Sequence, residues 1–145
     1  MKLVFGVLLI LSVATFASAE ILSVKQNSVE ISDSSNSYIA QVILVVPRHY
    51  PLKVVQKDGK NYKVSDYMGR EGWVDQSAIG TGRTVVVKVG RGNIRTGPGT
   101  EHDLMFRANR GVVFKVLARK DDWLKVEHES KRVGWIARSL VWGNG

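Results

Sequence analysis

The side chains that could perform chemistry in this chain are few and scattered. The three histidines, His49, His102 and His128, lie far apart, and none has the spacing of a metal site. Asp121 and Asp122 are adjacent, so an extended backbone would point them to opposite sides, which suits no acid and base pair. The chain has no cysteine and none of the common nucleophile, zinc-protease or phosphate-loop motifs. The sequence therefore predicts binding rather than catalysis, without a metal or other cofactor.

The segment best suited to binding lies in the second half of the chain. Residues 93–100 read Asn-Ile-Arg-Thr-Gly-Pro-Gly-Thr, in which proline fixes φ and the flanking glycines free it, so a sharp turn is expected. The turn opens a polar loop over 100–103, which can fold over a sheet as one wall of a shallow groove. Trp123 can form the other wall, although a core position suits it equally well. The candidate ligand-binding residues are Asn93, Arg95, Thr96, Pro98, Thr100, His102 and Trp123.

Arg95 and the tryptophans that follow a glycine also need an assignment. Arg95 either faces a ligand or forms an ion pair with a loop carboxylate such as Glu101 or Asp103, and we favour the ion pair. Trp73 and Trp135 each follow a glycine in an alternating segment, and we expect both to belong to the core because large aromatic side chains usually do.

The elements that must position these residues occur twice in the chain. Trp73 returns as Trp135 and Val64 returns as Val126, at a constant offset of 62 (135 − 73 = 126 − 64 = 62). A repeat of this length, with a full succession of strands and turns, indicates two small domains in tandem. We predict domains over 20–79 and 84–141, a linker over 80–83 and a tail over 142–145.

The predicted strands are β-branched or aromatic segments separated by turn residues. They cover 22–24, 28–31, 42–46, 52–55, 62–64, 72–74, 84–89, 93–95, 112–117, 123–127 and 132–136. Helical periodicity is absent beyond the N-terminal apolar stretch, except that 77–79 and 139–141 can each close one 3₁₀ turn. Domains this small favour a barrel, since closing a sheet removes most exposed edges. The expected fold is all-β, with two small, partly open barrels in tandem.

The N-terminus has the pattern of a secretory signal peptide. Lys2 precedes an apolar stretch over 3–16, and Ala17-Ser18-Ala19 is a small-residue cleavage site before Glu20. The rival interpretation is an uncleaved membrane anchor, but the stretch is shorter than the ~20 apolar residues that a bilayer requires. We expect residues 1–19 to be removed and no integral membrane segment to remain. A secreted, cysteine-free chain fits a bacterial periplasm or cell envelope.

The positive charge is concentrated in the second domain. The whole chain carries a formal net charge of +8. Residues 20–82 hold seven Lys or Arg against seven Asp or Glu, whereas residues 83–145 hold thirteen against six. The excess either keeps a small domain soluble or attracts a polyanion. For a secreted protein, that polyanion would belong to the cell wall or to lipopolysaccharide rather than to nucleic acid.

Four motifs of the second domain follow one another in a distinctive order. They are Asn-Ile-Arg-Thr-Gly-Pro at 93–98, Phe-Lys-Val-Leu at 114–117, Asp-Trp-Leu-Lys-Val at 122–126 and Val-Gly-Trp-Ile at 133–136. This succession resembles the bacterial SH3 (SH3b) domain over 84–141. The first domain resembles the family less, because it has 29–34 in place of the first motif and Asn61 in place of Trp123.

The resemblance implies an SH3-like barrel that binds a ligand without turning it over. SH3b domains often accompany cell-wall hydrolases, so we expect this chain to bind peptidoglycan or its peptide stem (a muropeptide), with the site in the second domain. The alternatives are an envelope protein–protein adaptor and an accessory subunit of a cell-wall hydrolase. A large apolar patch on the first domain would favour the adaptor. Tyr38 and Tyr50 of that domain either stack on a ligand or pack against the partner domain.

Overall fold

The structure is a computed structural model, which describes residues 1–3 and 19–145. Residues 4–18, which contain most of the expected signal peptide, lie outside the described residues. Within the described part, no helix is long and apolar enough to cross a membrane. Every strand lies between Ile21 and Gly143, so residues 20–145 contain the whole folded region that the structure describes.

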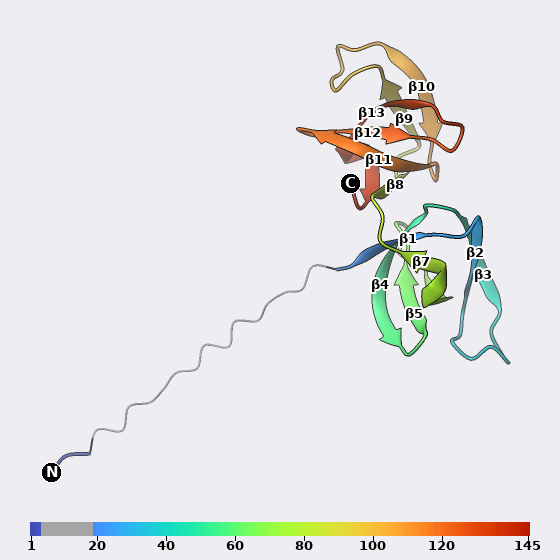
Figure 1. Cartoon of the computed structure of the whole chain (residues 1–145), viewed down its shortest axis with the longest axis vertical. Coiled ribbons are helices and arrows are strands. Elements are labelled where there is room, and N and C mark those ends of the chain that lie inside the picture. The colour runs from blue at the N-terminus through green and yellow to red at the C-terminus, as the bar shows by residue number, and fades with distance from the viewer. Residues whose placement is uncertain (4–18) are drawn as a thin grey trace.

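The described chain forms two antiparallel sheets of seven strands each, placed end to end along the long axis of the molecule (Figure 1). The first sheet contains β1 (Ile21–Val24), β2 (Ser28–Ser32), β3 (Val42–Pro47), β4 (Pro51–Asp58), β5 (Asn61–Ser65), β6 (Glu71–Asp75) and β7 (Ile79–Gly80), in the order β3-β2-β6-β5-β4-β1-β7. The second contains β8 (Thr84–Val87), β9 (Arg91–Arg95), β10 (Leu104–Asn109), β11 (Val113–Lys120), β12 (Trp123–Glu127), β13 (Val133–Ala137) and β14 (Val141–Gly143), in the order β10-β9-β13-β12-β11-β8-β14. Because the two orders are the same after a shift of seven labels, the sequence repeat is also a repeat of topology.

The predicted all-β architecture of two partly open barrels is confirmed. Each sheet ends in strands with a single neighbour, β3 and β7 in the first and β10 and β14 in the second, so neither barrel closes. The 3₁₀ turns occur as η1 (Gln76–Ala78) and η2 (Arg138–Leu140). The predicted C-terminal tail is wrong in part, because Trp142 and Gly143 pair with β8. Gly80 likewise pairs with β1, so the segment between the sheets is shorter than the predicted linker.

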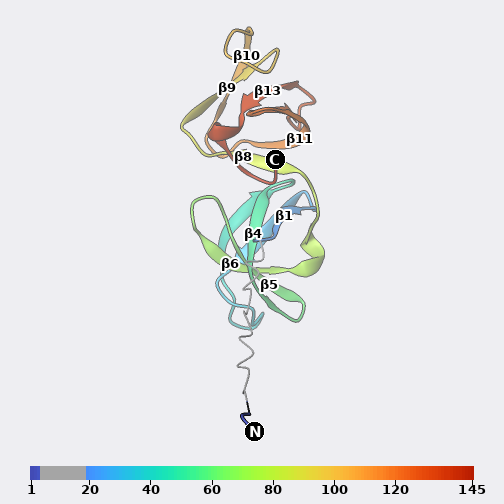
Figure 2. The same cartoon turned by 90° about the vertical axis from the view of Figure 1, so that its left-hand side faces the viewer.

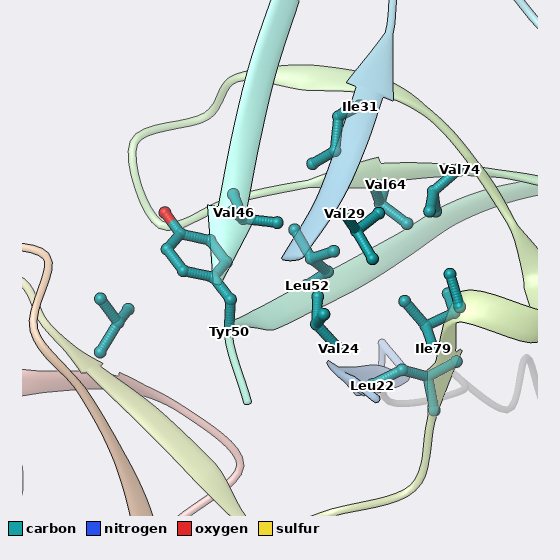
Figure 3. Packing of buried hydrophobic residues seen from close by; sticks show 12 residues of the cluster. Leu22, Val24, Val29, Ile31, Val46, Tyr50, Leu52, Val64, Val74 and Ile79 are labelled. Carbon is teal, nitrogen blue, oxygen red and sulfur yellow. The ribbon is translucent and has the colours of Figure 1, made fainter. Parts of the chain in front are cut away.

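Each barrel encloses its own apolar core, built by the alternation of side chains along its strands. Figure 3 shows Val29 and Ile31 of β2, Leu52 of β4 and Val64 of β5 gathered between the strands of the first barrel. The second core consists of Val85, Val87, Ile94, Ala108, Phe114, Val116, Leu124, Val126, Ile136 and Val141. Since no cysteine is present, these two clusters supply the main stabilisation of each barrel.

The strand β8 joins the two barrels, because both of its faces are buried. Val85 and Val87 belong to the core of the second barrel, whereas Val86 is fully buried in the core of the first. Next to Val86, the hydroxyl groups of Thr84 and Ser23 lie 2.6 Å apart in a buried hydrogen bond between the domains. In Figure 2, β8 crosses the molecule at the junction of the two sheets. The two domains therefore pack against each other and are not joined by a flexible linker alone.

Tyr50 lies on the first domain's side of this junction, and its hydroxyl meets a buried carboxylate. Only 4% of the Tyr50 surface is exposed, so it packs inside rather than stacking on a ligand. Its Oη donates to Asp66 Oδ2 at 3.3 Å. Burial, followed by the negative charge of Asp66, raises the pKa of Tyr50. Tyr38, in contrast, is 96% exposed.

Candidate functional site

The two central tryptophans lie outside the cores, so the prediction that they are core residues is wrong. In β13, Gly134 and Ile136 are buried, and alternation therefore turns Trp135 to the outer face, where it is half-buried. The same pattern in β6 places Trp73 on the outer face of the first sheet. Glycine precedes each tryptophan because a Cβ on Gly134 would overlap the side chain of Ile94 in the neighbouring strand β9.

We expect Gly134→Ala to lower the free energy of unfolding by roughly 1–3 kcal/mol, the usual cost of forcing an extra carbon into a packed site. Urea denaturation of residues 20–145 measures this loss. Gly90→Ala is the matched control, because nothing lies within 4 Å of a Cβ at that exposed position. Equal stability of the two variants would show that β9 and β13 do not require the close approach at Gly134.

The register of the second sheet gathers aromatic and basic side chains on one outer face. Trp135 stands opposite Arg95 of β9 on one side and opposite Lys125 of β12 on the other. Trp123 pairs with Ala137, one outward position further along β13, so it is a diagonal neighbour of Trp135. We name Asn93, Arg95, Trp123, Lys125 and Trp135 the outer-face cluster.

The polar residues of β9 extend this cluster toward the edge strand β10. Asn93 alternates with the buried Ile94 and therefore shares the outer face with Arg95. Its Oδ1 accepts a hydrogen bond from Arg107 Nε at 3.3 Å. Within residues 1–3 and 19–145, none of Arg95, Arg107 and Lys125 forms an ion pair with a carboxylate. Arg95 and Lys125 thus flank Trp135 without a neutralising partner, and Arg107 extends the positive charge to β10.

The loop that follows β9 is fixed by Arg95, although not through the predicted ion pair. Arg95 Nη1 donates to the backbone carbonyl of His102 at 3.1 Å, so the favoured pairing with Glu101 or Asp103 is wrong. The carbonyl is the better partner because the loop folds back beside β9, where Thr96 N also donates to Asp103 O at 2.9 Å. His102 packs over Gly97, at a position where any Cβ would overlap its ring.

The structure divides the seven predicted site residues into two groups. Asn93, Arg95 and Trp123 share the outer face of the sheet. The other four lie in the loop beyond β9, and they are Thr96, Pro98, Thr100 and His102. Because β13 lies between β9 and β12, Trp135 occupies the centre of the surface on which a groove was expected. Sequence reasoning missed Trp135 and Lys125 as site residues. The alternation along each strand could have identified both, because Trp135 lies between Gly134 and Ile136, and Lys125 lies between Leu124 and Val126.

The first domain carries only part of this arrangement. Its central row runs from Ser32 of β2 through Trp73 of β6 to Lys63 of β5, so serine takes the place of Arg95. Asn61 takes the place of Trp123, and the Lys63 ammonium lies 3.6 Å from a carboxylate oxygen of Glu71. One tryptophan thus remains, without a second aromatic and without an unneutralised cation in the row.

Comparison with known proteins identifies the second domain. Residues 88–143 match the family model of the bacterial SH3 domain, which confirms the resemblance found in the sequence. Two solved structures similar to this chain are those of NlpC2 and NlpC1 from Trichomonas vaginalis, at 12% and 14% identity and a TM-score of 0.40 each. The matches cover 86% and 88% of this chain and 48% and 47% of those proteins, so the chain spans about half their length. Comparison with the curated proteins gave no match.

Proposed function

We propose that this chain is a non-catalytic binding protein of the bacterial cell envelope, which recognises peptidoglycan or its peptide stem through the outer-face cluster. The observation that carries the proposal is the row Arg95–Trp135–Lys125, with Trp123 beside it, on the sheet of the bacterial SH3 domain. The expected signal peptide over 1–19 supports secretion to the periplasm or cell envelope, where this polymer is found.

The chemistry of the cluster suits a ligand that is part sugar and part acidic peptide. A half-exposed indole offers a flat apolar face on which a sugar ring or a peptide plane can stack, with an N–H that remains free to donate. The guanidinium of Arg95 and the ammonium of Lys125 flank the central indole and can meet carboxylates through charge-assisted hydrogen bonds. Exposed contacts of this kind are individually modest and are screened by salt. The affinity of one site should therefore be weak and salt-dependent.

We expect Trp135→Ala to weaken the binding of residues 20–145 to purified peptidoglycan sacculi by about tenfold or more, which corresponds to the roughly 1.4 kcal/mol or more lost when a central aromatic anchor is removed. Co-sedimentation across a salt series measures the affinity. A Trp123→Ala, Arg95→Ala double variant should show a similar loss, and binding of the unaltered chain should fall as salt rises.

Trp73→Ala is the matched control, because Trp73 occupies the same position in the first sheet. It should retain wild-type binding, and circular dichroism should show that all the variants are folded. If the wild-type chain does not bind sacculi at low salt, the proposal fails. If the two tryptophan variants lose binding equally, the site is not confined to the second domain.

One surface favours the adaptor as a second candidate function. The edge strand β3 of the first sheet exposes Val42, Ile43 and Val45 by 49%, 49% and 59%, and the preceding loop exposes Tyr38 and Ile39. A long apolar edge with unpaired backbone groups can accept an extended segment of another protein as an added strand. The adaptor function would become the leading one if the folded chain does not bind sacculi but binds an envelope protein in a pull-down. The Ile43→Lys variant should then no longer bind that protein.

A further inference from the structure

A pocket of about 330 Å³ lies at the junction of the two domains, apart from the outer-face cluster. Its lining comes from the end of β1, the turn between β3 and β4, the segment between the sheets and β11. The charged residues that line it are Lys25, Arg48, Arg83 and Lys115, and all four are cations. We name it the junction pocket. Both domains contribute to its charge, although the first domain has no net charge of its own.

Carboxylates of the protein neutralise little of the positive charge of these four cations. Among residues 1–3 and 19–145, Lys25, Arg48 and Arg83 form no ion pair. Lys115 reaches only Glu127, at 3.9 Å, and Glu127 is shared with Lys131. Positive charges held around one hollow repel each other, and the field they create there favours an anion.

His49 lies within this field of positive charge. It lines the pocket between Arg48 and the second domain. Its pKa is lowered by burial first and then by the cations Lys115, Arg48 and Lys131, and only Glu127 opposes them. Its backbone holds a left-handed φ of 69°, and its N–H donates to Val24 O at 2.9 Å. The backbone is therefore fixed at His49, and the lowered pKa favours the uncharged form of its imidazole.

The walls of the pocket are set by the shared packing of the domains. Ser23 and Thr84 both line it, and the buried hydrogen bond between their hydroxyl groups ties β1 to β8. With Val86 inserted in the first core, the cations of the two domains cannot separate without breaking apolar contacts. A ligand would meet charges already held close together, which lowers the entropy cost of binding.

We propose that the junction pocket binds a small oligoanion that carries two or more carboxylate or phosphate groups. A compact polyvalent anion can contact cations of both domains at once. A monovalent anion carries a single charged group and can neutralise the cations on only one side of the pocket. This site is separate from the peptidoglycan site proposed above and does not depend on it.

The test is a titration of residues 20–145 with citrate, pyrophosphate and acetate at low salt, in which two-dimensional NMR monitors each addition. Citrate or pyrophosphate should shift the amide signals of His49, Arg83 and their neighbours, and acetate should have little effect. A bound anion stabilises the imidazolium, so the pKa of His49 should rise on saturation. The arms distinguish the source of the chemistry, because preference for citrate indicates a carboxylate ligand and preference for pyrophosphate indicates a phosphate ligand.

An Arg48→Gln, Arg83→Gln double variant should weaken binding by at least about tenfold, because it removes two of the four cations that can form charge-assisted hydrogen bonds to the anion. The matched control is Lys60→Gln, Lys120→Gln, which removes the same charge from exposed hairpin positions away from the pocket. The control should bind within about twofold of wild type. Absence of binding by both polyvalent anions, or equal weakening in the two double variants, would overturn the proposal. Sacculi binding by Arg48→Gln, Arg83→Gln should persist, so this site and the outer-face cluster can fail separately.

Discussion

Replacing Asp66 with alanine should lower the free energy of unfolding by roughly 3 kcal/mol, because it removes a buried carboxylate that accepts hydrogen bonds from several buried and part-buried donors. One oxygen of this fully buried carboxylate accepts from the backbone N–H groups of Met68 and Arg70, each at 2.9 Å. The other accepts from Tyr50 Oη and from the Arg70 guanidinium, whose Nε and Nη2 each lie at 2.7 Å. The alanine variant leaves the Tyr50 hydroxyl and the turn N–H groups without partners. Urea denaturation of residues 20–145 measures the loss.

The control for this prediction is Asp33→Ala. Asp33 also accepts a backbone N–H, that of Gln41 at 2.8 Å, but it does so on the surface, where water replaces the lost bond. Asp33→Ala should therefore lower the free energy of unfolding much less than Asp66→Ala does. Asp66→Asn should fall between the two, because the amide retains one acceptor oxygen but turns a donor toward the Arg70 guanidinium. If Asp66→Ala is no less stable than Asp33→Ala, the network does not hold the turn between β5 and β6.

The fold was largely predictable because each barrel is built from local alternation and turns. The β-branched and aromatic segments between turn residues predicted most strands, and the repeat at offset 62 showed that they form two sets. The strand β10 escaped prediction because Leu104 and Met105 are both exposed, so it has no buried face at its start. The repeat itself held the missing signal, since the same offset carries the predicted strand over 42–46 onto 104–108.

The candidate site was only partly predictable, because side-chain size and the alternation of side chains along the strand favoured different positions for the tryptophans. Trp135 looked like a core residue on size, yet the glycine and isoleucine around it fix its side chain on the outer face. Arg95 alternates with the buried Ile94 and lies on the outer face, but the sequence could not identify its hydrogen-bond partner, because that partner depends on how the following loop folds. Which carbonyl or carboxylate a guanidinium reaches depends on the path of the backbone, and the spacing of charges does not determine that path.

The junction was the least predictable part of the molecule. The segment over 84–87 reads Thr-Val-Val-Val, an apolar run that fits a strand buried on both faces as well as a strand at the centre of one barrel. Only the structure shows that Val86 enters the neighbouring core while Val85 and Val87 stay in their own. The junction pocket could not be predicted either, because its cations come from four separate segments of the chain.

Val86→Asp should have the largest effect on how the two domains unfold. It places an unpaired carboxylate in a fully buried site between two cores, which costs roughly 4 kcal/mol or more. The shared packing predicts that the wild-type chain unfolds in one cooperative urea transition. In the variant, the first domain loses part of its core and the second keeps most of its own, so we expect two separated transitions, each with a smaller dependence on denaturant.

Val55→Asp is the matched control, because Val55 lies on β4 of the first sheet with 45% of its surface exposed. It should unfold in one transition near the wild-type midpoint. Two transitions in the wild-type chain would mean that β8 couples the domains too weakly to hold the junction pocket in shape, and anion binding there should then be weak as well. One transition in the wild type and two in Val86→Asp, with anion binding lost in the variant alone, would show that the packing of a single valine sets both the cooperativity of the tandem and the geometry of the cationic site between its domains.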